Sequence, residues 1–185
     1  MEKADIILND SAMAHFDQVR LDLNLILLEV VYNGKENTIN HRNFQRVEFI
    51  EGNKKRLFIP ANRFLYNGTA LNGFVEQIGQ GETPIVVLVN YFVDIKPPTP
   101  TANITGGAVV DTWIKEKRIY LFKDSQLTPI RNKKELNAFY SRQGKKLETY
   151  LKQQKPNIKD PEELYQTGAT FRKIGAIRCA VILRQ

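Results

Sequence analysis

The stretch GFVEQIGQGETPIVVLVNYFVDI, residues 73–95, predicts two antiparallel strands joined near Gly79-Gln80-Gly81. Its second half runs from Ile85 to Ile95 and consists mainly of β-branched and aromatic residues, which favour strands. Glycine tolerates the positive φ angles of tight hairpin turns, so the glycine pair marks a turn. The stretch therefore indicates a β-hairpin, and the same pattern recurs upstream of it.

Residues 47–59, VEFIEGNKKRLFI, predict two further strands joined at Gly52-Asn53. In residues 21–39, LDLNLILLEVVYNGKENTI, leucines alternate with polar residues, which predicts a strand with one buried face. That strand is expected to turn at Asn33-Gly34, a strong hairpin signal. Residues 1–17 give weak signals, with Asp5 to Leu8 expected as a short edge strand.

The C-terminal part changes from strand patterns to helix patterns. Prolines after Lys96 interrupt the sheet, and residues 118–130 predict its last hairpin, with a turn at residues 123–126. Asn132, followed by Glu135, has the spacing of a helix capping box. A second helix is expected to bury Leu147, Tyr150 and Leu151, and a third to begin at Asp160-Pro161.

These patterns predict the α+β class: an antiparallel β-meander, curved or half-barrel-like, followed by two or three short helices. We expect a sheet region at residues 1–112, a final hairpin and basic helical appendage at 113–166, and a tail of uncertain structure at 167–185. In that tail, alternation after Ile177 allows either a strand or a loose apolar end. The parts are expected to form one compact unit.

The positive charge is confined to the C-terminal part. The chain carries a net charge of +7, with 10 Lys/Arg and 13 Asp/Glu in residues 1–112 but 17 Lys/Arg and 7 Asp/Glu after them. A basic surface attracts nucleic acid, anionic lipid or acidic polymer, although exposed helix faces carry such charge without any partner. No apolar run reaches the roughly 18 residues that predict a transmembrane helix.

Residues suited to catalysis or metal binding are few. The single cysteine, Cys179, lies in an apolar run without the basic neighbours that would lower its pKa, and it excludes an intrachain disulfide. The two histidines, His15 and His41, belong to no zinc motif. We therefore expect no catalytic residue, no metal and no cofactor.

The candidate binding surface is a set of cations between the apolar positions of the predicted helices: Lys133, Lys134, Arg142, Lys145, Lys146, Lys152 and Lys155. The first functional hypothesis is a non-enzymatic protein that binds another protein or an anionic surface component there. A second is nucleic-acid binding through the same helices, although lysine outnumbers arginine and the aromatic residues have core spacing. A third is a hydrolase with a carboxylate pair.

Residues 118–140, RIYLFKDSQLTPIRNKKELNAFY, and the Lys-rich residues 141–166 resemble the C-terminal region of a broad group of secreted Bacteroidota proteins of unknown function. Gly73, Phe74, Glu76 and Gly81 match a hairpin pattern of the same group. The resemblance covers about residues 18–166. It implies export and a periplasmic or cell-envelope location, but it identifies no site residues.

Two departures qualify the location. The first residues, MEKADIILNDSAMAHF, lack the apolar core of a signal peptide, and residues 167–185 do not match the ending usual in the group. A removed leader and a cytoplasmic protein therefore both stay open.

Overall fold

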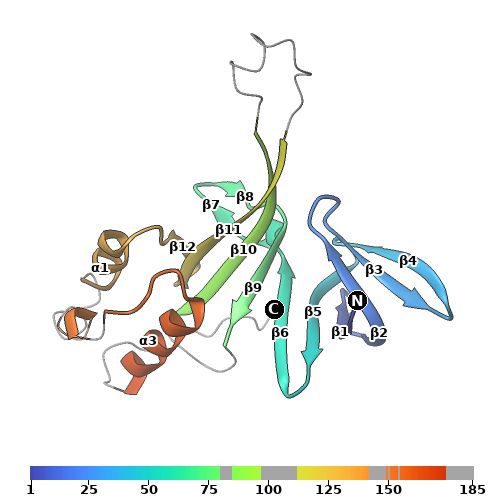
Figure 1. Cartoon of the computed structure of the whole chain (residues 1–185), viewed down its shortest axis with the longest axis horizontal. Coiled ribbons are helices and arrows are strands. Elements are labelled where there is room, and N and C mark those ends of the chain that lie inside the picture. The colour runs from blue at the N-terminus through green and yellow to red at the C-terminus, as the bar shows by residue number, and fades with distance from the viewer. Residues whose placement is uncertain (80–84, 97–111, 142–148, 150, 154, 174–185) are drawn as a thin grey trace, which may run out of the picture.

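The computed structural model describes residues 1–79, 85–96, 112–141, 149, 151–153 and 155–173. Residues 171–173 are described by their backbone only. A ten-stranded sheet dominates the fold, and its strands pair throughout in antiparallel fashion in the order β12-β11-β10-β9-β6-β5-β1-β2-β3-β4 (Figure 1). The strands of this sheet are β1 (Glu2–Leu8), β2 (Met13–Asp22), β3 (Leu27–Tyr32), β4 (Lys35–Asn40), β5 (Phe44–Glu51), β6 (Lys54–Pro60), β9 (Phe74–Ile78), β10 (Val86–Lys96), β11 (Thr112–Lys123) and β12 (Gln126–Pro129).

The remaining elements are short or helical. A two-stranded sheet, β7 (Leu65–Tyr66) and β8 (Thr69–Ala70), follows the 3-10 helix η1 (Ala61–Arg63). The helices α1 (Lys133–Ser141) and α3 (Pro161–Lys173) follow the sheet, and residues 149 and 151–153 are also helical. The α+β class, with a curved antiparallel sheet followed by short C-terminal helices, is confirmed. No helix within the described ranges is long and apolar enough to cross a membrane.

The first five strands form a curled unit. Strands β4 and β5 lie four positions apart in the sheet, about 19 Å if the sheet were flat. Yet the chain from Asn40 to Phe44 reaches at most about 14 Å. The sheet must therefore curl so that the two strands approach each other. A tight turn makes this connection, since the Asn43 N–H donates to the Asn40 carbonyl at 2.9 Å.

Two predictions for the N-terminal half are wrong. β1 is a central strand that pairs with both β2 and β5, because its apolar residues Ile6 and Ile7 are buried there. The leucine-rich segment breaks into β2 and β3, because the Asp22 carboxylate accepts hydrogen bonds from the N–H groups of Asn24 and Leu25 and closes a turn. Leu25, predicted to be buried, is 62% exposed at that turn.

The predicted hairpin turns are confirmed where the structure describes them. Asn33 and Gly34 have φ angles of 52° and 72°, and Glu51 pairs with Lys54 across Gly52-Asn53. Strands β9 and β10 pair as expected. Gly81, Leu147, Tyr150 and the end after Lys173, with Ile177 and Cys179, lie outside the described residues.

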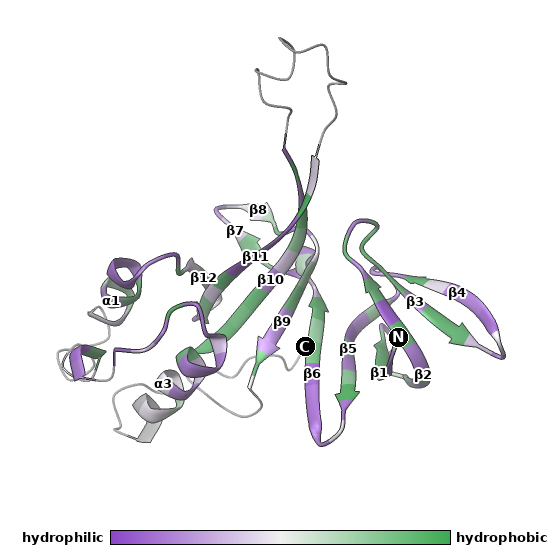
Figure 2. Cartoon of the chain, viewed as in Figure 1, coloured by the Kyte–Doolittle hydropathy of each residue, from purple (hydrophilic) through white to green (hydrophobic). Residues whose placement is uncertain are grey.

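Three apolar clusters hold the fold together. The first lies between β9–β11 and the helices, and it includes Leu136, Tyr140 and Leu164. The second fills the curl around Phe44 and Phe74, whose rings stack with centroids 6.4 Å apart. The third covers the opposite face of β9–β11, beneath η1 and β7. Both faces of β10 are thus buried over Val86–Val89, which explains the apolar run at the start of this strand (Figure 2).

Candidate functional site

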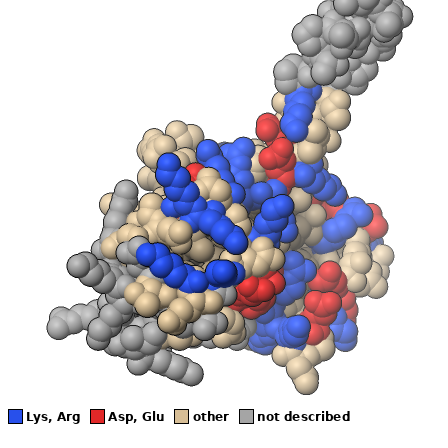
Figure 3. Space-filling view, turned by 60° about the vertical axis from the view of Figure 1, so that its left-hand side comes forward, with Lys and Arg blue, Asp and Glu red and all other residues tan. Residues whose placement is uncertain are grey.

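A groove lined by cations lies where the last hairpin meets the helical part. Its volume is about 320 Å³, and we call it the basic groove. Its lining residues come from three segments: Lys117, Arg118, Ile119, Pro129, Ile130, Arg131, Ile158 and Lys159. Lys and Arg side chains gather around a hollow on this side of the molecule (Figure 3).

The hairpin register brings two arginines of the basic groove together. Its turn is formed by Asp124 and Ser125, both with positive φ, and Tyr120 pairs with Pro129. The Ile130 N–H then donates to the Ile119 carbonyl at 2.9 Å, so the register continues past β12. It places Arg131 beside Arg118. Like charges directly opposite each other on neighbouring strands repel, so this pair favours an anion between them.

Helix caps fix the other side of the basic groove. Asn132 caps α1 by accepting from the Glu135 N–H at 3.0 Å, as predicted, and the Glu135 carboxylate accepts from the Arg131 N–H at 2.6 Å. Asp160 caps α3 by accepting from the Glu162 N–H at 2.9 Å. Lys159 precedes that cap, and the Ile158 side chain packs against the apolar cluster, so the backbone that carries Lys159 is held in place.

Carboxylates lie near the basic groove, with Glu135 on the Arg131 N–H and Asp160 next to Lys159, but both cap helices. Within the described ranges, the side chains of Lys117, Arg118, Arg131 and Lys159 form no ion pair. The Arg118 guanidinium lies over the Phe92 ring, 4.6 Å from its centroid, which orients this cation without neutralising it. The floor consists of isoleucine and proline. The basic groove thus combines cationic walls with an apolar base.

The cations predicted from the sequence lie elsewhere or outside the described residues. Lys133, Lys134, Lys152 and Lys155 are exposed and do not line the basic groove. Arg142, Lys145 and Lys146 lie outside the described residues. Sequence reasoning missed all four groove cations. The pairing of Arg118 with Arg131 could have been inferred from the predicted turn at residues 123–126, because both arginines lie equally far from that turn. No feature of the sequence indicated Lys159.

A second polar cluster joins β6, β9 and β10 through the side chains of Arg56, Glu76 and Tyr91. The Glu76 side chain is 8% exposed, and its carboxylate accepts from the Arg56 guanidinium at 2.7 and 3.3 Å and from the Tyr91 hydroxyl at 2.8 Å. The hydrogen bond with Glu76 raises the pKa of Arg56. Burial, followed by the hydrogen bond to Glu76, raises the pKa of Tyr91 to about 12. This cluster borders a pocket of about 380 Å³ lined by Met1, Glu2, Val19, Arg20, Leu21, Leu23, Phe49, Arg56, Phe58 and Tyr91.

The raised pKa of Tyr91 predicts an alkaline loss of stability. In the unfolded chain a tyrosine ionises near pH 10, whereas Tyr91 in the folded chain keeps its proton to about pH 12. The folded state therefore binds more protons in this window, and its stability falls as pH rises from about 10 to 12. Urea unfolding at pH 9 and pH 11 measures the loss. Tyr91→Phe should reduce it, and an equal loss in that variant would contradict the assignment.

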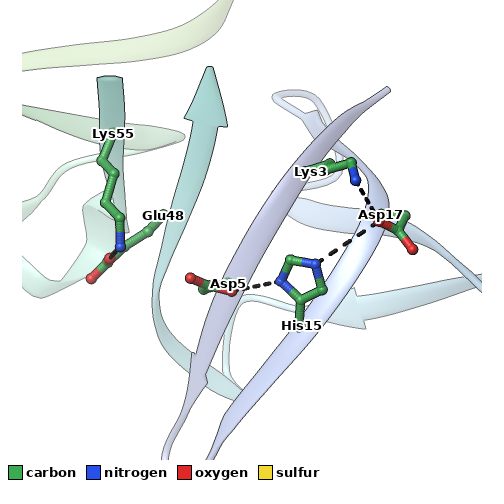
Figure 4. Close-up of polar contacts among 6 residues, drawn as sticks. All are labelled: Lys3, Asp5, His15, Asp17, Glu48 and Lys55. Atoms are coloured by element: carbon green, nitrogen blue, oxygen red, sulfur yellow. Dashed lines mark hydrogen bonds and ion pairs between the residues drawn. The ribbon is translucent and has the colours of Figure 1, made fainter. Parts of the chain in front are cut away.

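Carboxylates also form a polar row across β6, β5, β1 and β2 (Figure 4). His15 Nδ1 lies 2.8 Å from Asp5 and its Nε2 lies 3.9 Å from Asp17, which pairs with Lys3 at 3.1 Å. Lys55 lies 3.5 Å from Glu48. Each carboxylate of the row has a basic partner, and within the described ranges no three His, Cys, Asp or Glu residues are placed to hold a metal ion.

A cleft lined by two carboxylates bears on the hydrolase hypothesis. Glu29 and Glu36 line an opening of about 470 Å³ together with Arg20, Asn37 and Thr38. The Arg20 guanidinium is hydrogen-bonded to Glu29, its cross-strand partner. Glu29 is thus one half of a cross-strand ion pair.

Against this geometry, no protein-family model, curated protein sequence or solved structure matches the chain.

Proposed function

We propose that this chain is a non-enzymatic binding protein that holds an anionic partner in the basic groove. The observation that carries the proposal is the set of four cations, from three segments of the chain, without carboxylate partners within the described ranges. An anionic group placed between Arg118 and Arg131 would relieve their repulsion and accept charge-assisted hydrogen bonds. The apolar floor would accept a neighbouring aliphatic group.

The composition of the basic groove favours a protein partner over nucleic acid. Sequence-tolerant binding of single strands relies on exposed aromatic rings on which bases stack. The floor of the basic groove is aliphatic instead, with Ile119, Ile130 and Ile158, and the one nearby ring, Phe92, lies beneath the Arg118 guanidinium. Acidic protein segments carry both carboxylates and aliphatic side chains, and they fit this combination.

We place the partner in the bacterial cell envelope. The support for this location is the sequence resemblance to secreted Bacteroidota proteins over about residues 18–166. Immunoblotting of fractionated cells that carry the native gene tests it, and recovery of the protein only with cytoplasmic markers would overturn the location without affecting the binding proposal.

The double variant Arg118→Glu/Arg131→Glu is expected to lose at least about tenfold in affinity for poly-L-glutamate, or roughly 1.4 kcal/mol. Both side chains are exposed, so the fold should remain. The matched control is Lys133→Glu/Lys134→Glu, which makes the same change in charge on the same part of the chain but outside the basic groove. Fluorescence anisotropy at two salt concentrations measures both affinities.

The control separates a defined groove from general surface charge. A loss below about threefold is expected for Lys133→Glu/Lys134→Glu, because these exposed charges do not line the basic groove and act only through attraction screened by salt. Equal losses in the two double variants would assign binding to the wider basic surface instead. Tighter binding of single-stranded DNA than of poly-L-glutamate at equal charge would favour the nucleic-acid hypothesis.

A further inference from the structure

Strand β11 has a long outer edge without a neighbour. Along its whole length it pairs with β10, from Phe122 opposite Val86 to Thr112 opposite Lys96. On the other side, β12 pairs only with Tyr120–Lys123. From Thr112 to Arg118, no strand within the described ranges lies along the outer edge, and Figure 1 shows β11 continuing well past β12.

The direction of the backbone groups on this edge follows from one hydrogen bond. The Ile119 carbonyl accepts from Ile130 beyond β12, so the N–H and C=O groups of Ile119 point outward. Alternate residues of a strand present their groups on the same side. The N–H and C=O groups of Trp113, Lys115 and Lys117 therefore also point to the open edge. Such a row of donors and acceptors is a template for an added strand.

Charge makes this edge selective. Lysines on an edge strand commonly protect it, because they repel another copy of the same edge and oppose the pairing of neutral chains. Here Lys115 and Lys117 stand on one face, and the basic groove with Arg118, Arg131 and Lys159 lies at the end of the edge where β12 stops. The one carboxylate on this segment, Glu116, pairs with Lys96 at 3.6 Å. An acidic strand is thus attracted where a basic one is repelled.

The far end of the edge offers an apolar contact. Trp113 and Ile95 lie directly opposite each other on β11 and β10, and they are 59% and 48% exposed. They stand on the same face as Lys115 and Lys117, since residues two apart share a face. A strand added to this edge would place a side chain against Trp113 and others toward the lysines.

We propose that the anionic partner is an extended acidic peptide segment of another protein, which adds to the sheet as a strand along Thr112–Arg118 and ends in the basic groove. This inference rests on the proposed function, because it requires that the basic groove binds an anion. It adds that main-chain hydrogen bonds to β11 supply part of the affinity.

A capped octapeptide of alternating threonine and glutamate tests strand addition. Two N-methylated versions keep all four carboxylates, one with N-methyl groups on the threonines and one on the glutamates. In an added strand only one set of peptide N–H groups faces β11. One N-methylated version should therefore lose at least about tenfold in affinity, while the other binds nearly as well as the parent peptide.

A variant of the protein gives independent evidence. Lys115→Pro removes an outward N–H, and Lys115→Gln removes the charge alone, so the proline variant should bind the peptide at least about fivefold more weakly than the glutamine variant. If Lys115→Pro disturbs the hairpin, amide hydrogen exchange of the unmodified protein serves instead. The peptide should then protect the N–H groups of Trp113, Lys115 and Lys117.

The outcomes separate this inference from the proposed function. Equal affinity for both N-methylated peptides, with loss in Arg118→Glu/Arg131→Glu, would leave an anion-binding groove and overturn strand addition. No binding of any of the peptides or of poly-L-glutamate would overturn both. Full competition by single-stranded DNA of the same charge would overturn the peptide partner.

Discussion

Gly73→Ala is expected to lower the free energy of unfolding by about 3 kcal/mol or more. Gly73 has a φ angle of +83°, and a Cβ built on it would lie 2.0 Å from the Tyr91 carbonyl oxygen and 2.9 Å from the Phe92 Cα. Left-handed backbone costs a residue with a Cβ about 1–2 kcal/mol, and overpacking typically adds about 1–3 kcal/mol. Neither backbone atom can retreat easily, because β10 is held between β9 and β11.

Two other glycines provide matched controls for this variant. Gly34 and Gly68 have φ angles of +72° and +78°, but a Cβ on either would have no neighbour within 4 Å. Alanine at these positions should cost only the backbone term, about 1–2 kcal/mol. Urea unfolding of the three variants gives the comparison. Equal losses in all three variants would show that the close approach of Gly73 to β10 does not affect the free energy of unfolding.

Glu76→Ala is expected to cost about 2–3 kcal/mol. Breaking a buried ion pair typically costs about 3–5 kcal/mol, and the 40% exposure of the Arg56 side chain reduces this because water can solvate the freed guanidinium. The Tyr91 hydroxyl also loses its acceptor. Equilibrium unfolding at pH 7 measures the loss, and Glu51→Ala, at the exposed end of β5, is the control, with an expected change below about 0.5 kcal/mol.

Local chemistry made the hairpins predictable, since turns such as Asn33-Gly34 depend on a few adjacent residues. The same holds for the caps at Asn132 and Asp160. Of the four positions in the hairpin pattern, which is one part of the sequence resemblance, three have a physical role: Gly73 allows close approach, Phe74 is fully buried, and Glu76 holds two polar partners. The roles of these three residues depend on contacts with residues distant in sequence. The hairpin pattern could therefore be recognised in the sequence, but the structural reasons for it could not.

The order of strands was not predictable, because it depends on contacts between distant segments. β1 pairs with β5, from which three strands separate it in sequence, and its short, partly polar sequence resembles that of an edge strand. The basic groove could be predicted from the sequence only in part. The hairpin register pairs Arg118 with Arg131, but the position of Lys159 depends on how the segment before α3 packs on the sheet.

The central position of β1 has a consequence for biosynthesis. β1 pairs on one side with β2, which follows it at once, and on the other side with β5, which is made only after β3 and β4. While the ribosome adds the residues between Leu8 and Phe44, one side of β1 has no native neighbour, a delay on the order of seconds at cellular rates of synthesis. A nascent chain stalled before Phe44 should therefore bind a strand-capturing chaperone, and release should coincide with the emergence of β5.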